Sequence, residues 1–91
     1  LGSEFMTQLN NEIIQQKLRE KISDAAEIRV AFDGSKAHII VVLEAFASMR
    51  RIQKQQLIYG ALEAEIADGS IHAVTMETLT PEEWDKVKMF R

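Results

Sequence analysis

The fold is decided by AEIRVAFDGSKAHIIVVLE, residues 26–44, which contains two strand patterns separated by a turn. Over residues 26–32, apolar side chains alternate with other residues, as in a half-buried strand. Asp33 and Gly34 then suit a tight turn, because aspartate bonds the nearby backbone and glycine accepts positive φ. Residues 37–44 are apolar on both faces through their middle. The stretch therefore predicts a β-hairpin whose second strand is the more central one.

Helical spacing precedes and follows this hairpin. Residues 7–25 predict a helix with Thr7 or Asn10 as its N-cap. Its apolar stripe consists of Ile14, Leu18, Ile22 and Ala25. Residues 48–67 predict a second helix that ends before Gly69, a residue suited to the left-handed position after a helix. The face predicted for this helix comprises Ile52, Gln55, Tyr59, Leu62 and Ile66.

A third strand and a short last helix complete the predicted elements. The strand pattern runs from Ile71 to about Thr78 and places His72, Val74 and Met76 on one face. Thr80-Pro81-Glu82-Glu83 is typical of a helix start, with a threonine N-cap, proline in the first position and a glutamate that closes a capping box. Trp84, in the helix that follows, is interpreted as a packing residue, with a partner contact as the alternative.

The order α-β-β-α-β-α predicts a single α+β domain with a three-stranded mixed sheet covered by helices. The hairpin joins antiparallel strands, while the long middle helix permits a parallel crossover to the third strand. Three strands cannot bury a core alone, so two amphipathic helices are expected to cover one face of the sheet.

Composition excludes several classes of protein. The 91 residues include no cysteine, which removes disulfides, thiolate metal sites and cysteine nucleophiles from this chain. No apolar run approaches the roughly 20 residues of a membrane span. Residues 1–5 are interpreted as a cloning remnant before a single domain over residues 6–91, whose net charge of −2 argues against a dedicated nucleic-acid binder. A cytoplasmic, reducing location is the expectation.

The chemistry-bearing residues are few. No nucleophile elbow, phosphate loop or helical zinc motif is present, so no enzymatic activity is expected. His72 follows a Gly-Ser turn at the start of a strand, where it is either a structural histidine bonded to backbone or a metal ligand. His38 lies within the second strand, on the same side as Ile40 and Val42, and has the same two interpretations.

Arg50, Arg51 and Lys54 form a basic stretch that contains no acidic residue between Ala45 and Ala61. The plain interpretation is a solvated helix face. The functional alternative is a docking patch for an acidic partner surface, for glutathione or for phosphates. Three charges predict only weak nucleic-acid binding at physiological salt.

Three blocks of sequence together resemble the BolA-like family. They are Ile58-Tyr59-Gly60-Ala61-Leu62, Ile71-His72-Ala73-Val74 and Leu79-Thr80-Pro81-Glu82-Glu83-Trp84. Asp33-Gly34-Ser35 and Lys54-Gln55-Gln56 look closest to the YrbA branch of that family, and the resemblance covers residues 8–88. It implies a class II KH-like arrangement, although this chain has no Gly-x-x-Gly loop.

The resemblance implies a non-enzymatic partner of a monothiol glutaredoxin that shares a bridging [2Fe-2S] cluster. The family's cluster histidine corresponds to His72. Its second ligand, a His or Cys in the loop between the first two strands, corresponds to Lys36, and a protonated ammonium group cannot ligate iron. His38, two residues on, is the candidate substitute. Every thiolate would come from the partner and its glutathione, so no cluster is expected on the isolated chain, which is expected to be a monomer or weak homodimer.

A second function from another class stays open at this point. A KH-like surface together with Arg50, Arg51 and Lys54 predicts a nucleic-acid-binding regulator with weak affinity for DNA. A third alternative is a protein-interaction module that contacts a glutaredoxin without any cluster.

Overall fold

The computed structural model describes residues 10–90, so the predicted remnant (residues 1–5) and the alternative N-cap Thr7 lie outside the described part. The elements follow the predicted order with the middle helix divided. In chain order they are α2 (Asn11–Lys21), β1 (Glu27–Phe32), β2 (Lys36–Val42), the 3-10 helix η1 (Glu44–Ser48), α3 (Arg51–Ala61), α4 (Glu63–Ala67), β3 (Ala73–Leu79), α5 (Pro81–Val87) and the 3-10 helix η2 (Lys88–Phe90).

The three strands form one mixed sheet in the order β1-β2-β3, which confirms that the second strand is central. β1 pairs antiparallel with β2, from Glu27 opposite Val42 to Phe32 opposite Ala37. β2 pairs parallel with β3, from Lys36 opposite Ala73 to Val42 opposite Leu79. The end of β2 and the start of β3 therefore lie at opposite ends of the sheet.

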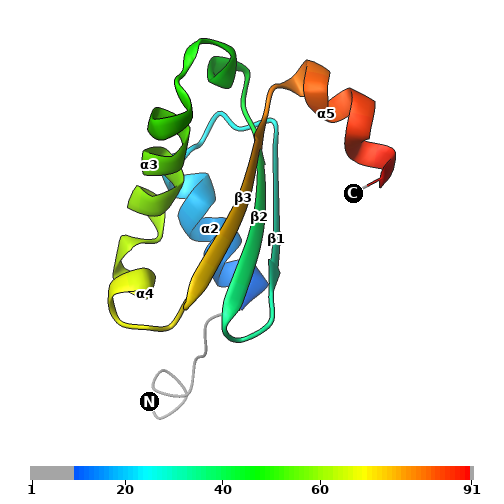
Figure 1. Ribbon diagram of the computed structural model, residues 1–91. Coiled ribbons are helices and arrows are strands. Elements are labelled where there is room, and N and C mark those ends of the chain that lie inside the picture. Colours follow the sequence, from blue (N-terminus) through cyan, green and yellow to red (C-terminus); the bar gives the residue numbers. More distant parts are fainter. Residues whose placement is uncertain (1–9, 91) are drawn as a thin grey trace.

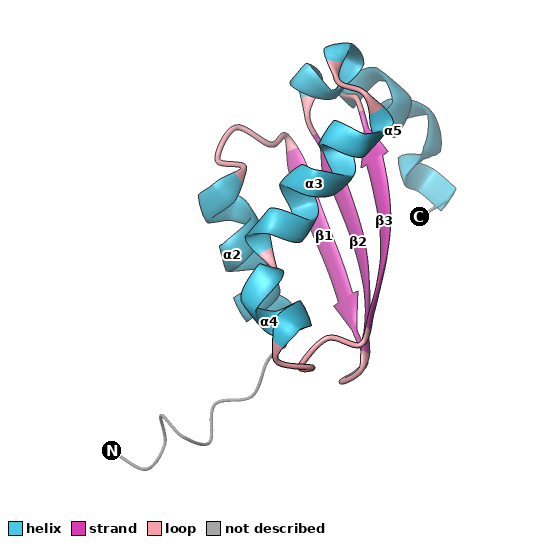
Figure 2. Cartoon of the chain, turned by 60° about the vertical axis from the view of Figure 1, so that its left-hand side comes forward, coloured by secondary structure: helices cyan, strands magenta, loops and turns pink. Residues whose placement is uncertain are grey.

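One face of the sheet is covered by α2 and α3, as expected (Figure 1; Figure 2). Asn10 caps α2 by accepting a hydrogen bond from the backbone of Ile13, which confirms one of the two predicted N-caps. The core on this face consists of buried apolar side chains from the two helices, β1, β2 and the segments between them. Its most buried members include Ile14, Leu18, Ile28, Ile39, Val41, Phe46, Ile58 and Leu62.

Within the described residues, the other face is covered near one end, by α5 (Figure 1). Thr80 caps this helix and Glu83 closes the predicted capping box. Trp84 packs against Ile40 and Val42 in a small second cluster, which confirms its packing role. The sheet beyond this cluster carries more exposed side chains.

The predicted middle helix over residues 48–67 is wrong in two respects. The chain first makes the 3-10 turn η1, which buries Phe46, and α3 starts only at Arg51. The helix is then interrupted at Leu62, whose backbone (φ −116°, ψ 17°) is not helical, so α4 follows as a separate short helix.

The predicted apolar face of that segment is wrong except at Leu62. Ile52, Tyr59 and Ile66 are 56%, 44% and 37% exposed, whereas Ile58 and Leu62 are fully buried. Ile58 and Leu62, which contact the core, are four residues apart. The predicted stripe does not continue along a single helix, because the backbone is not helical at Leu62. Among residues 10–90, no helix is long and apolar enough to cross a membrane.

Candidate functional site

The turn between β1 and β2 is held by the side chain of Asp33. Its Oδ1 accepts hydrogen bonds from the backbone N–H groups of Ser35 (2.9 Å) and Lys36 (2.7 Å). Gly34 adopts φ +98°, the left-handed conformation that the sequence predicted for this position. The hydrogen bonds from Lys36 and then Ser35 lower the pKa of the Asp33 carboxyl below its usual value. The turn is therefore fixed by an ionised carboxylate.

His72 enters the sheet beside this turn. Its backbone N–H donates to the carbonyl of Ser35 (2.7 Å), and the Ser35 Oγ lies 2.9 Å from the His72 Nδ1. The preceding residue, Ile71, is 2% exposed and donates its N–H to the carbonyl of Glu65 (3.1 Å). A buried anchor on one side and a sheet hydrogen bond on the other thus hold an exposed imidazole at the edge of the molecule.

The second ring nitrogen of His72 is open. Within residues 10–90, Nε2 forms no hydrogen bond, whereas Nδ1 is engaged by Ser35. A neutral imidazole offers one lone pair to a metal. Over the same residues no group of three or more His, Cys, Asp or Glu side chains is arranged to hold a metal ion. The exposed nitrogen of His72 can therefore supply one ligand to a metal.

Lys36 lies next to His72, on the neighbouring strand. It opposes Ala73, the residue that follows His72, so the position predicted for a second ligand is adjacent to His72 in space. The side chain there is an exposed ammonium group, which carries no lone pair when protonated. Lys36 can contribute positive charge at this corner of the sheet and cannot serve as a ligand in that state.

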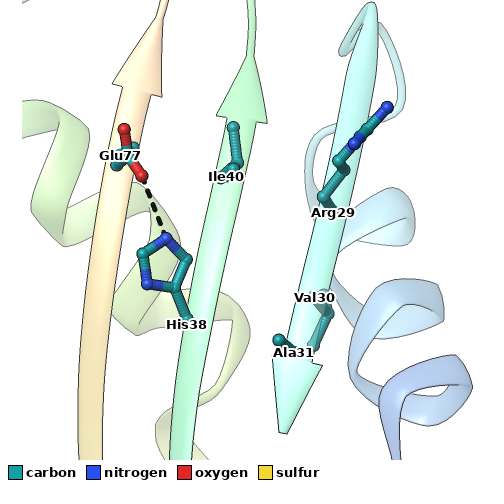
Figure 3. Close-up of a pocket in the computed structure, with 6 residues that line it drawn as sticks. All are labelled: Arg29, Val30, Ala31, His38, Ile40 and Glu77. Atoms are coloured by element: carbon teal, nitrogen blue, oxygen red, sulfur yellow. Dashed lines mark hydrogen bonds and ion pairs between the residues drawn. The ribbon is translucent and has the colours of Figure 1, made fainter. Parts of the chain in front are cut away.

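His38 lies elsewhere, on the open face of the sheet (Figure 3). Its Nε2 is 3.0 Å from the Glu77 Oε2 on β3, and both side chains line a surface hollow of about 380 Å³ with Arg29, Val30, Ala31 and Ile40. His38 opposes Thr75, three residues after His72. The structure therefore does not bring the two histidines together, and one nitrogen of His38 is already paired with a carboxylate.

The basic stretch lies at the far end of the sheet from His72. α3 begins where β2 has ended, while His72 precedes β3, and these two points are separated by the length of the strands (Figure 1). Arg50 and Arg51 are exposed. Lys54 is half-buried, with its Nζ 5.8 Å from the centre of the Phe46 ring. The two candidate binding regions are consequently distinct, and Lys54 also has a packing role.

Sequence reasoning did not single out Ser35 as a site residue. Ser35 and His72 are 37 residues apart, and their contact depends on the register of the parallel β2–β3 pair. The sequence predicted that this pairing is parallel but contains no local signal for its register. The available signal was the Asp33-Gly34-Ser35 turn itself, which the family resemblance had included.

Known proteins resemble this chain in both sequence and structure. The family model described as BolA-like protein matches residues 10–83. The acid stress protein IbaG of Escherichia coli, also called YrbA, is 47% identical over 75 residues, covering 82% of this chain and 87% of that protein. This similarity confirms the predicted YrbA branch. A protein of Haemophilus influenzae named DNA-binding transcriptional regulator BolA is 32% identical over 82 residues, with coverage of 80% and 79%. The crystal structure of a Bol-like protein from Babesia bovis superimposes with a TM-score of 0.72 at 26% identity, covering 90% of this chain and 96% of that one.

Proposed function

The chain belongs to the BolA-like family, and on this premise we propose that it is a non-enzymatic adaptor that pairs with a monothiol glutaredoxin. In the pair, the two proteins share a bridging [2Fe-2S] cluster that serves iron–sulfur trafficking or iron and stress regulation. His72 supplies the ligand from this chain, and the thiolates come from the glutaredoxin and its glutathione.

One observation carries the proposal: the ring of His72 is exposed at the end of the sheet, with Nδ1 bonded to Ser35 and Nε2 unbonded within residues 10–90. An exposed imidazole with one open nitrogen suits a ligand that completes a partner's metal centre. The absence of cysteine from the chain accords with a shared cluster, because this protein cannot supply thiolate ligands itself.

The residues around His72 have defined roles in this proposal. Ile71 anchors the segment in the core, and the turn at Asp33 places Ser35 against the ring. The cluster, when bound, supplies one-electron redox chemistry and transferable iron and sulfide, with a potential raised by imidazole ligation. The ligand nitrogen must be unprotonated, so acid weakens the complex.

The test is reconstitution of the cluster on a mixture of this chain, a monothiol glutaredoxin and glutathione, followed by visible absorption and circular dichroism. We expect His72→Ala to abolish the spectrum of the mixed complex, so that the mixture shows only the spectrum of the cluster bound to the glutaredoxin without this chain. His38→Ala is the matched control and is expected to keep the wild-type spectrum. An unchanged spectrum for His72→Ala would overturn the assignment of the ligand, and a stable complex without colour or iron would favour a plain interaction module.

A second candidate function is weak DNA binding. The name of the Haemophilus influenzae relative favours it, as do the exposed Arg50 and Arg51 at the start of α3. The patch adds little electrostatic affinity, because counterion release from two or three contacts is small. The net charge of −3 further opposes long-range attraction to DNA.

Because this patch lies at the other end of the sheet from His72, the two functions can be separated by mutation. We expect Arg50→Ala combined with Arg51→Ala to weaken binding to short duplex DNA and to reduce its dependence on salt concentration. The same double variant should keep the cluster spectrum. DNA binding that is absent, or that does not respond to salt, would eliminate the second candidate.

A further inference from the structure

Ser35 holds His72 at two points, the backbone N–H and the ring nitrogen Nδ1. The carbonyl oxygen of Ser35 accepts a hydrogen bond from the backbone N–H of His72 (2.7 Å), and the Oγ of Ser35 lies 2.9 Å from the ring nitrogen Nδ1 of His72. Ser35 is itself held, since its N–H donates to the Asp33 carboxylate (2.9 Å). The chain of contacts runs from a fixed turn, through one serine, to the exposed ring.

The contact between Ser35 and His72 has two chemical forms. If the hydroxyl donates its proton to Nδ1, the neutral ring must carry its own proton on Nε2, and the exposed nitrogen is then a donor without a free lone pair. If Nδ1–H instead donates to Oγ, the proton lies on the inner nitrogen and the Nε2 lone pair faces outward. Only the second form can bind a metal through Nε2.

We infer that Ser35 is a positioning residue for His72: its Oγ accepts the proton of Nδ1 and so directs the Nε2 lone pair toward a metal centre held by a partner protein. The effect on metal binding rests on the proposed function, whereas the contact between Ser35 and His72 is present in this chain by itself. Ser35 acts twice, because the hydrogen bond selects the tautomer and also restricts rotation of the ring before the partner arrives. Less rotational freedom then remains to be lost on binding.

The contact between Ser35 and His72 matters more because the adjacent position holds a lysine, Lys36. Lys36 occupies the adjacent position and cannot act as a ligand while protonated. His72 is then the single ligand from this corner of the sheet, so its orientation is not reinforced by a second bond from the same chain. Partners of metal-bound histidines typically change metal affinity by about 10- to 100-fold when removed.

The first test measures the tautomer in the protein without any metal. The ¹⁵N chemical shifts of the His72 ring, recorded in alkaline buffer where imidazoles are neutral, identify the protonated nitrogen. We expect the proton on Nδ1 in the wild type. Ser35→Ala should shift the population toward the Nε2–H form that free histidine prefers, whereas Ser35→Thr, which keeps the hydroxyl, should restore the wild-type shifts.

The second test measures loss of the cluster from the reconstituted complex with a monothiol glutaredoxin. We expect Ser35→Ala to bleach about 10-fold faster than the wild type. The matched control is Ser48→Ala, because the Ser48 Oγ also makes one hydrogen bond, to the carbonyl of Ala45 (3.1 Å), near the other end of the sheet. That variant should change neither the ring tautomer nor the bleaching rate.

The outcomes separate this inference from the proposed function. A wild-type ring with its proton on Nε2, or a Ser35→Ala variant with unchanged shifts and bleaching, would overturn the role of Ser35. If His72→Ala leaves the cluster intact, the assignment of His72 as the ligand in the proposed function fails, while the ring shifts still decide whether Ser35 sets the tautomer.

Discussion

The two faces of the sheet are covered to different extents. On one face of β2, Ala37, Ile39 and Val41 lie beneath α2 and α3 and are at most 1% exposed. On the other face, Ile40 and Val42 contact Trp84, whereas His38 is exposed and lines a surface hollow. Hydrophobic burial on the first face thus supplies most of the stability. The candidate ligand His72 belongs to neither face, because it precedes β3 at the end of the sheet.

The residues that stabilise this small domain are separate from those that are candidates for binding. Burial of an aliphatic side chain contributes roughly 1.5–3 kcal/mol. Within residues 10–90, the large side chains that are fully buried belong to the main core, except Val42, which lies in the cluster with Trp84. The residues with candidate chemistry lie at the margins, where their exchange should cost little stability. Substitutions on each face test this separation, beginning with the largest expected effect.

Ile39→Ala should destabilise the domain most. Ile39 is fully buried in the main core, so the substitution removes apolar contacts and leaves a cavity, at a cost of about 4 kcal/mol. The matched variant is Ile40→Ala on the opposite face, which we expect to cost less than half as much because its cluster is small. Urea unfolding followed by circular dichroism measures both. Equal costs would show that the two faces contribute alike.

Trp84→Ala should have the next largest effect, about 3 kcal/mol. Trp84 is 8% exposed and packs against Ile40 and Val42, and the centre of its ring lies 4.9 Å from the guanidinium carbon of Arg29. Loss of the ring removes the main contact of α5 with the sheet. Hydrogen exchange should therefore accelerate in α5 more than in α2. Uniform acceleration throughout the domain would contradict a separate role for this cluster.

Much of this architecture follows from local sequence patterns. The alternation over residues 27–32, the turn chemistry at Gly34 and the capping signals at Asn10 and Thr80 all involve neighbours in the chain. Such signals depend on backbone preferences and short-range hydrogen bonds, so one sequence suffices to detect them. The order of elements and the central position of β2 were predictable for the same reason.

The remainder depends on tertiary packing. α3 and α4 carry two competing apolar stripes, one with Ile52, Tyr59 and Ile66, the other with Ile58 and Leu62, and spacing alone does not decide which is buried. The core selects the second stripe. The contact between Ser35 and His72 likewise requires the register of two strands joined by a long crossover. Local patterns predicted His72 as a candidate and could not supply its partner.

The capping box of α5 predicts an acid-sensitive element on the less covered face. The Thr80 backbone N–H is the main cause that holds the pKa of Glu83 below its ordinary value of 4.5. A carboxyl whose pKa is lower in the folded state stabilises the fold at pH values above its pKa in the unfolded chain. This contribution is lost as the pH falls through its pKa in the folded state. Glu83→Gln should therefore be less stable than the wild type at neutral pH, with the difference shrinking below about pH 4.5.

Urea midpoints at neutral pH and at several acidic values measure this difference. Comparison with the wild type is necessary because the pKa values of Asp33 and Asp68 are also lowered, so the parent protein has further acid-sensitive contacts. Glu82→Gln is the control in the same turn, since its ion pair with Lys86 is long, at 3.8 Å. A constant difference between Glu83→Gln and the wild type at all pH values would contradict the electrostatic origin.

His38→Ala should have the smallest effect on stability, a few tenths of a kcal/mol. Its pair with Glu77 joins side chains that are 47% and 24% exposed, and exposed pairs contribute little because water screens them. His72→Ala should be similarly mild in urea unfolding, because that ring is exposed as well. The two variants should differ in reconstitution with the glutaredoxin, where only His72→Ala abolishes the mixed spectrum. If His38→Ala abolished it too, the open face would take part in the site, and the division between the faces and the end of the sheet would be wrong.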